Sequence, residues 1–256
     1  MGFTRLLLVD AFNLIRRIYE AMPSSDIEDV ILSCKQSLAR ALRQHPATHV
    51  CVVFDSHDTS WRHLIYPDYK GGRKPTPQPL LDNIDRFELA FAELGVRSLT
   101  VSAFEADDLI ATLAKGIVDN AVSNEVIILS TDKGFLPLLS NQLKVYNHFD
   151  GLELTREHVL DKYGVSIDQL TDYWAMAGDA SNHIKGVSKI GKKTATTLLQ
   201  NYQDLDTILN LADAEGAVLK VQEAGEHVAL CKLLVTLKTD VALGINLKEL
   251  RYFKQS

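Results

Sequence analysis

Long apolar runs, paired cysteines and a surplus of positive charge are all missing from this 256-residue sequence. No apolar stretch approaches the roughly 20 residues that a membrane-spanning helix needs, so we expect no membrane partner. The chain turns acidic at Asp10, too early for a secretory signal, and we expect a cytoplasmic protein. The three cysteines, at positions 34, 51 and 231, lack metal-ligand spacing, and the first two fall in apolar patterns typical of buried thiols.

The composition fits a globular protein but leaves its partner open. Hydrophobic residues make up 46% of the chain, which suits a sizeable core, and the length allows one large domain or two unequal ones. The formal net charge of −6 argues weakly against a nucleic-acid partner. It does not exclude one, because carboxylates can gather around a metal while basic residues gather elsewhere.

Strand-like and helix-like segments alternate through the first half of the chain. Apolar runs at 6–9, 49–54, 96–101 and 126–129 indicate strands, and helical spacing covers 30–42, 80–94 and 107–118. This order predicts an α/β fold with a mostly parallel central sheet flanked by helices. Helical patterns dominate from 158 to 237. We therefore place an α/β core at 1–155 and a helical region at 156–256.

Acidic side chains follow the predicted strands at the edge where parallel sheets bind their ligands. In chain order they are Asp10, Asp55, Glu105, Asp107, Asp108 and Asp132. Each alone is as often a turn residue or a helix cap. Together they predict carboxylates from four segments at one edge of the sheet.

Carboxylates held close together repel one another unless a cation neutralises them. Oxygen ligands without histidine or cysteine select Mg²⁺, with Mn²⁺ as the alternative. Such an ion activates water and stabilises charge on a phosphate during in-line attack. The pattern predicts metal-dependent hydrolysis of a phosphodiester, with Asp107, at the start of its helix, as the most direct metal ligand.

The stretch 56–79 is longer than a loop that only connects two elements usually is. It combines basic and aromatic residues, among them Trp61, Tyr69, Lys70 and Arg73. Positive charge and stacking rings suit a strand of nucleic acid. The alternative is a disordered surface loop.

Residues 184–195 read I-K-G-V-S-K-I-G-K-K-T-A and predict a helix-hairpin-helix within 173–203. Gly186 and Gly191 would permit positive φ, and amides of the following helix would point at a phosphate. We predict contacts with DNA phosphates, without sequence preference, from Lys189, Ile190, Gly191, Lys192, Lys193 and Thr194. The alternative is an ordinary pair of helices with its lysines in solvent.

Six motifs in this order resemble the flap endonuclease (5′-nuclease) family, which includes the 5′-nuclease domain of bacterial DNA polymerase I. They are V-D-A-F-N-L-I-R-R, V-V-F-D, Y-P-D-Y-K-G-G-R, E-A-D-D-L-I-A-T-L, S-T-D-K-G and G-D-A-S-N-H-I-K-G-V-S-K-I-G-K-K-T-A. The resemblance implies a PIN-like fold. It also implies a structure-specific flap endonuclease and 5′-3′ exonuclease that acts on DNA at single-strand/duplex junctions.

The resemblance further implies roles for particular residues. The stretch 56–79 would form an arch over the active site. Lys70 and Arg73 would contact the scissile phosphate, with Asp10, Asp55 and Asp108 in the same catalytic set. A K⁺ ion would be held by main-chain carbonyls, which by position are those of Met176, Ala177, Lys185, Val187 and Ile190.

Two carboxylates of the family pattern are missing. Gly134 and Asn182 stand where the family has aspartates, whereas Asp179 is retained as a further candidate metal ligand. This reduced set is similar to exonuclease IX, a stand-alone bacterial branch. Two hypotheses stay open: an active Mg²⁺-dependent nuclease, and a flap-DNA-binding protein with little or no catalytic activity. The retained Lys70 and Arg73 favour the nuclease.

Overall fold

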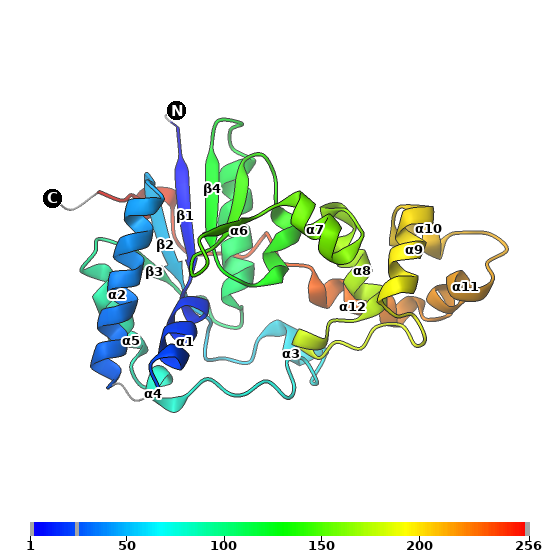
Figure 1. Cartoon of the computed structure of the whole chain (residues 1–256), viewed down its shortest axis with the longest axis horizontal. Helices are drawn as coiled ribbons and strands as arrows, with labels where there is room; N and C mark the ends of the chain where they lie inside the picture. Colours follow the sequence, from blue (N-terminus) through cyan, green and yellow to red (C-terminus); the bar gives the residue numbers. More distant parts are fainter. Residues whose placement is uncertain (1–2, 24–25, 254–256) are drawn as a thin grey trace.

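The computed structural model describes residues 3–23 and 26–253, so the outermost ends of the two expected domains lie outside the described residues. Figure 1 shows a body built on a β-sheet and a helical lobe that extends away from it. Among the described residues, no helix has the length and hydrophobicity needed to cross a membrane.

Six strands form one sheet in the order β3-β2-β1-β4-β5-β6. Their bounds are β1 (Arg5–Asp10), β2 (His49–Val53), β3 (Arg97–Leu99), β4 (Glu125–Leu129), β5 (Leu143–Asn147) and β6 (Leu152–Leu154). Neighbouring strands are parallel except β5 and β6, which are antiparallel. The direction of strand addition reverses between β1 and β4, and ligands bind beyond the carboxyl ends of strands at such a switch point.

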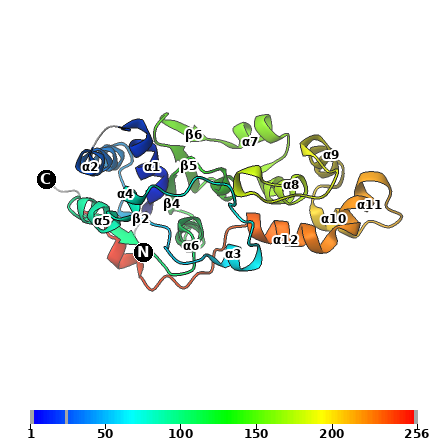
Figure 2. The same cartoon turned by 90° about the horizontal axis from the view of Figure 1, so that it is seen from below.

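Helices cover both faces of the sheet, as Figure 2 shows from below. Those of the body are α1 (Ala11–Ala21), α2 (Ile27–Gln44), α4 (Gln78–Leu81), α5 (Ile84–Ala92) and α6 (Ala106–Val118). Leu7 and Val9 of β1 pack into one hydrophobic cluster, whereas Leu6 and Leu8 pack into another on the opposite face. Burial on both faces explains why the strands read as continuous apolar runs.

The lobe is helical and shares its core with one face of the body. Its helices are α7 (Arg156–Tyr163), α8 (Leu170–Ala177), α9 (Lys192–Tyr202), α10 (Leu205–Leu209), α11 (Gly216–Glu223) and α12 (Gly225–Val235). Short 3₁₀ turns are η1 (Lys133–Leu138), η2 (Ile167–Gln169), η3 (Ala180–Asn182) and η4 (Leu247–Leu250). Trp174 and Leu199 of the lobe belong to the same buried cluster as Leu109 of α6.

The predicted α/β fold with a mostly parallel sheet and a helical C-terminal region is confirmed. Cys34 and Cys51 are buried free thiols, as expected. Strands β5 and β6 were not predicted, and the single helix expected over 80–94 is two helices, α4 and α5.

The last residues return from the lobe to the body. The Tyr252 N–H donates to the Thr48 carbonyl at 2.9 Å, and Arg251 forms an isolated β-bridge with His49. Residues 251 and 252 fall in the expected helical region 156–256, yet they pack with the body, because their backbone pairs with residues 48 and 49 at the start of β2. The sequence from 238 to 253 lacks the long apolar pattern that would have marked this return.

Candidate active site

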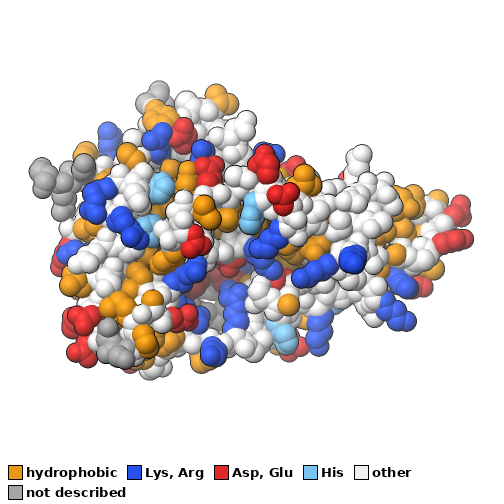
Figure 3. Space-filling model, viewed as in Figure 1, with side chains coloured by type: hydrophobic (Ala, Val, Ile, Leu, Met, Phe, Trp, Pro, Cys, Tyr) orange, Lys and Arg blue, Asp and Glu red, His pale blue; other side chains and the backbone are white. Residues whose placement is uncertain are grey.

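A cleft of about 260 Å³ opens at the carboxyl ends of β1 and β4. Four aspartates from four segments line it, and we name them the cleft carboxylates: Asp10, Asp55, Asp107 and Asp132. Figure 3 shows acidic side chains set back in a hollow at the centre of this face, with Lys and Arg side chains along its rim. The strand ends have brought together residues more than 120 positions apart in the sequence.

Short hydrogen bonds fix three of the cleft carboxylates. Asp10 caps α1 by accepting from the Asn13 N–H at 3.1 Å, and it also accepts from the Ser130 hydroxyl at 2.9 Å. Asp55 accepts from the Ala106 N–H at 2.8 Å, and Asp132 from the Gly134 N–H at 2.7 Å. Each side chain is thus held in place by neutral donors, which leave its charge uncompensated.

Within the described part of the chain, no cleft carboxylate forms a salt bridge. Burial, followed by repulsion from Asp55, raises the pKa of Asp10 to about 7. Burial and then the charges of Asp132 and Asp10 raise the pKa of Asp107 well above its ordinary value. Burial also raises the pKa of Asp55. A cation in the cleft would relieve this repulsion.

The cleft carboxylates share a cavity but do not form a closed ligand set. Among the described residues, no three His, Cys, Asp or Glu side chains lie close enough to hold a metal ion together. Mg²⁺ keeps several of its waters when it binds to proteins, and such waters can span the remaining gaps. The metal assignment of these residues therefore stays a prediction.

Two of the predicted ligands form ion pairs instead of lining the cleft. Asp108 is fully buried, and its two oxygens accept from the Arg62 guanidinium at 2.7 and 2.8 Å. Glu105 accepts from Arg62 at 2.9 Å and from Lys70. Although burial alone raises the pKa of Glu105, the charges of Lys70 and Arg62 hold it below its ordinary value.

The expectation that Asp108 belongs with Asp107 is corrected by the geometry of α6. Successive residues of a helix point about 100° apart, so neighbours in sequence face different surroundings. The Trp61 indole N–H and the Lys238 N–H also donate to Asp108, both at 2.8 Å. The donors to this carboxylate, Trp61, Arg62 and Lys238, all join α6 to another segment of the fold.

Arg62 is a buried residue whose importance sequence reasoning missed. Its side chain is 1% exposed, and besides the two carboxylates it donates to the carbonyls of Leu234 at 2.9 Å and Thr236 at 3.1 Å. It therefore ties the stretch 56–79 to α6 and to the C-terminal end of α12. Arginine is rarely buried unless paired, and no pattern in the sequence indicates where its partners lie.

The stretch 56–79 is built into the site. It contains α3 (Trp61–Ile65), and the chain after α3 runs across the carboxyl ends of the strands to α4 (Figures 1 and 2). Lys70 and Arg73 line the cleft together with its carboxylates. Burial lowers the pKa of Lys70, but Glu105 together with Tyr69, Asp107 and Asp55 outweighs this and raises the pKa above the ordinary value, so Lys70 stays positively charged. The alternative of a disordered surface loop is not supported.

The hairpin in the lobe has the predicted helices, but its positive φ angles are not at the predicted glycines. Positive φ occurs at Gly178 (81°), His183 (57°) and Lys189 (64°), and not at Gly186 or Gly191. Gly186 is needed for a different reason. A Cβ there would lie 2.3 Å from the Gly178 nitrogen, so only glycine permits this close approach of two backbones.

The surface of the hairpin presents lysines beside a helix N-terminus. Gly191 is the N-cap of α9, and Lys192 and Lys193 in its first turn are exposed. The first N–H groups of a helix lack partners inside the helix and favour anions. This geometry is compatible with the predicted phosphate contacts at 189–194.

The carbonyls predicted to hold K⁺ surround the same loop. The Met176 carbonyl accepts from the Val187 N–H at 2.8 Å, and the Val187 carbonyl accepts from the Ile190 N–H at 3.0 Å. The Lys185 carbonyl lies 2.7 Å from His227 Nε2. Each carbonyl oxygen has a second lone pair, which leaves it able to bind a cation as well. The K⁺ assignment stays a prediction.

Asp179, the further candidate ligand, has its charge already balanced. It is 3% exposed, and its oxygens accept from the Lys133 ammonium at 2.5 Å, the Ser181 hydroxyl at 2.6 Å and the Asn182 amide at 2.8 Å. Burial raises its pKa, but these donors, Lys133 foremost, hold the pKa below its ordinary value. Asp179 is not among the residues that line the cleft.

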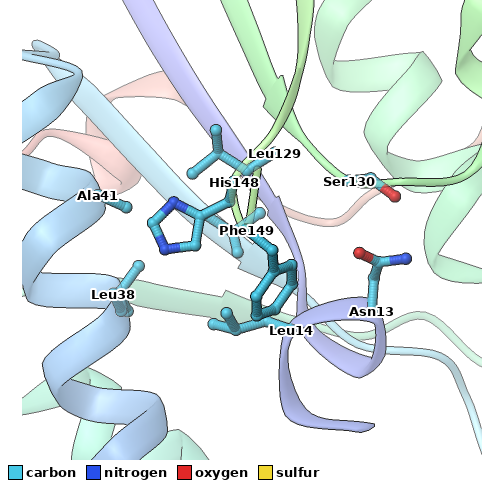
Figure 4. A pocket seen from close by; sticks show the side chains of 9 residues that line it. Asn13, Leu14, Leu38, Ala41, Leu129, Ser130, His148 and Phe149 are labelled. Atoms are coloured by element: carbon cyan, nitrogen blue, oxygen red, sulfur yellow. The ribbon is translucent and has the colours of Figure 1, made fainter. Parts of the chain in front are cut away.

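An enclosed cavity behind the cleft is not a substrate site. Figure 4 shows the rings of His148 and Phe149 turned toward Leu38 and Leu14. The cavity measures about 10 Å³, which is roughly the space for one water molecule. It shares Asn13 with the cleft, so it belongs to the packing that supports the cleft.

Comparison with protein families and curated proteins gives extensive matches. The 5′-3′ exonuclease N-terminal resolvase-like domain matches residues 5–164, and the 5′-3′ exonuclease C-terminal SAM fold matches residues 165–256. Flap endonuclease Xni of Psychromonas ingrahamii is 44% identical over 255 residues, covering 96% of this chain and 97% of that protein. Flap endonuclease Xni of Shewanella pealeana is 42% identical over 253 residues, covering 98% of both.

Solved structures share the fold across most of the chain. A mutant of T5 5′-exonuclease has a TM-score of 0.75 at 18% identity, covering 92% of this chain and 89% of that one. A bacteriophage T5 flap endonuclease, solved as a pseudo-enzyme–product complex with DNA and metal ions, has a TM-score of 0.75 at 19% identity. It covers 92% of this chain and 90% of that one. At such identities the likeness supports the fold.

Proposed function

Because the chain belongs to the 5′-3′ exonuclease family of flap endonucleases, we propose that it hydrolyses DNA at single-strand/duplex junctions with Mg²⁺ bound in the cleft. One observation carries the proposal for the site. Four buried or partly buried carboxylates, none in a salt bridge within the described residues, line one cavity together with Lys70 and Arg73. A protein that only bound DNA would not need to keep uncompensated carboxylates where a polyanion approaches.

The chemistry of the cleft fits a hard divalent cation. Its donors are oxygens only, and burial together with mutual repulsion favours neutralisation by a cation. Asp107 is the proposed direct ligand, with Asp10, Asp55 and Asp132 contributing directly or through water. When bound, Mg²⁺ or Mn²⁺ supplies an activated water and stabilises charge on the phosphate.

Glu105 and Asp108 leave the proposed ligand set. Glu105 acts on Lys70, because their ion pair keeps the ammonium charged and holds it at the cleft. Asp108 pairs with Arg62 and thereby stabilises the fold. Lys70 and Arg73 are then the positive side chains that bind and orient the scissile phosphate.

On this proposal the lobe binds the DNA duplex. Lys192, Lys193 and the first amides of α9 bind phosphates of a duplex, and they read charge rather than bases. A K⁺ ion on the loop carbonyls would add a positive charge at the same surface. This division gives the lobe the binding role and the body the hydrolytic role.

The experiment is a cleavage assay with three labelled DNAs: a 5′-flap, a nicked duplex and a free single strand. We expect cleavage at the flap junction in Mg²⁺ and in Mn²⁺, and none in excess chelator. The flap should be cut faster than the free single strand. A protein that binds the flap with high affinity but cuts it in neither metal would support the binding-module hypothesis and overturn the proposal.

A further inference from the structure

Asn182 lies between the arch and the hairpin and contacts functional groups of both. Its side-chain oxygen accepts from Arg73 Nη2 at 2.8 Å, and its side-chain nitrogen donates to Asp179 at 2.8 Å. Its main-chain carbonyl accepts from the Lys70 N–H, also at 2.8 Å. The residue therefore connects the side chain of Arg73 and the backbone of Lys70 to the loop that leads into the hairpin.

The arch needs this support, because its backbone is strained where it carries Lys70. Lys70 has φ of 54°, in the left-handed region that residues other than glycine seldom adopt. The hydrogen bond from its N–H to the Asn182 carbonyl holds it there. A second contact lies alongside, where His183 Nδ1 is 3.1 Å from the Asp68 carbonyl.

Arg73 is exposed, and the side chain of such a residue would sample many rotamers if it were not held. Two contacts from the loop restrain it: the Ser181 carbonyl accepts from Nε at 2.9 Å, and the Asn182 side chain accepts from Nη2. Within the described residues, Arg73 forms no salt bridge. Its charge is thus oriented but not neutralised.

An amide suits this position better than the aspartate of the family pattern. A carboxylate accepts hydrogen bonds only, whereas an amide accepts at its oxygen and donates at its nitrogen. Asn182 can therefore accept from Arg73 and donate to the buried Asp179 at the same time. An aspartate here would repel Asp179 and neutralise Arg73.

We propose that Asn182 is a positioning residue, which acts through Arg73 to aim its guanidinium at the scissile phosphate. What Arg73 binds rests on the proposed function, whereas the restraint on the arch does not. The hairpin loop and the phosphate contact are, on this proposal, parts of one hydrogen-bonded unit.

The kinetic test uses Asn182→Ala, with Ser181→Ala as the matched control. The control loses a hydroxyl bond to Asp179 but keeps the main-chain carbonyl that holds Arg73. We expect Asn182→Ala to lower the single-turnover rate constant about tenfold, equivalent to about 1.4 kcal/mol, with the Kd for flap DNA within about twofold. The rate constant of Ser181→Ala should stay within about twofold of wild type.

A double-variant cycle tests whether Asn182 acts through Arg73. In an Arg73→Ala background, adding Asn182→Ala should change the rate constant by less than about twofold. Independent tenfold losses would show that Asn182 acts by another route and would overturn the proposal. Thermal melting of each variant separates this effect from loss of the fold.

A second readout does not depend on cleavage of DNA. Trypsin cuts after lysine and arginine, and the exposed backbone that follows Arg73 is restrained through the same contacts. We expect Asn182→Ala to be cut after Arg73 at least about threefold faster than wild type, and Ser181→Ala to be cut at the wild-type rate. Equal rates in all three would overturn the proposal, even if wild type proved unable to hydrolyse DNA and the proposed function failed.

Discussion

Asp10 in the cleft and the paired carboxylates Asp108 and Asp179 are all buried, yet their surroundings differ. Asp10 is 7% exposed and meets neutral donors, whereas Asp179 is 3% exposed and meets the Lys133 ammonium. Burial and repulsion raise the pKa of Asp10 to about 7, while Lys133 and other donors outweigh burial and lower that of Asp179. Asp108, with 0% exposure, is paired with Arg62. A carboxylate paired with Lys or Arg stabilises the fold, whereas a cleft carboxylate without such a partner is free to bind a metal cation.

The sharpest test of this comparison is Asp107→Asn, which neutralises a cleft carboxylate. We expect the rate of flap cleavage to fall by roughly 10³-fold, the scale seen when a charge-stabilising group is removed. Stability should be unchanged or higher, because the variant removes repulsion and no salt bridge. Single-turnover cleavage and thermal melting measure the two effects. Cleavage within threefold of wild type would remove Asp107 from the site.

The neighbouring Asp108→Asn should do the opposite. It leaves the buried Arg62 guanidinium with Glu105 as its one charged partner, and removing one partner of a buried ion pair costs up to about 3–5 kcal/mol. Urea unfolding of Asp108→Asn beside Asp107→Asn measures the difference directly. If both variants unfolded at the wild-type urea concentration, the assignment of Asp108 to the fold would be wrong.

The pH dependence of stability distinguishes a carboxylate without a cation partner in another way. Since the pKa of Asp10 is about 7 in the folded protein against 3.8 ordinarily, the unfolded chain ionises first. The contribution of Asp10 to stability therefore falls as pH rises from about 4 to 7. Asp10→Asn should gain little at pH 4 and on the order of 4 kcal/mol at pH 8.

Denaturant melts of wild type and Asp10→Asn across this pH range check the prediction. Adding Mg²⁺ at pH 8 should stabilise wild type more than the variant, because the ion binds the folded cleft. A constant difference between the two proteins at all pH values would mean that Asp10 is already neutralised by a partner in the fold.

The smallest expected effect separates the lobe from the cleft. Lys192→Glu with Lys193→Glu should weaken DNA binding about tenfold, similarly for all sequences, and lower the slope of log K against log salt by roughly one per lost contact. Lys220→Glu with Lys248→Glu makes the same charge change at exposed positions elsewhere and serves as the control. Fluorescence anisotropy at several salt concentrations gives both slopes. Equal weakening in the two variants would show a general charge effect and no hairpin contact.

Sequence reasoning located the sheet and the acidic edge, because both depend on local patterns. The apolar run of β1 ends in Asp10, those of β2 and β4 are followed within three residues by Asp55 and Asp132, and parallel strands bring those ends together. It could not tell Asp107 from Asp108, since the distinction depends on Arg62, which lies more than 40 positions earlier in the chain. Which carboxylates are paired is a property of the tertiary fold.

The hairpin shows the same limit. Its glycines were recognised, but the left-handed residues turned out to be Gly178, His183 and Lys189. A glycine in sequence does not reveal whether it serves a positive φ or a close backbone contact, as at Gly186. Asn182 was read as a lost metal ligand, and only the structure shows its contact with Arg73.

We expect an ion to bind in the cleft, where carboxylates lack a cation partner, and calorimetric titration with Mg²⁺ tests this most directly. Asp107→Asn and Asp179→Asn remove the same charge, one from the cleft and one from a salt bridge. The account predicts that Asp107→Asn loses at least about a hundredfold in Mg²⁺ affinity and that Asp179→Asn stays within about threefold of wild type. Loss of affinity in Asp179→Asn, with wild-type affinity in Asp107→Asn, would contradict it.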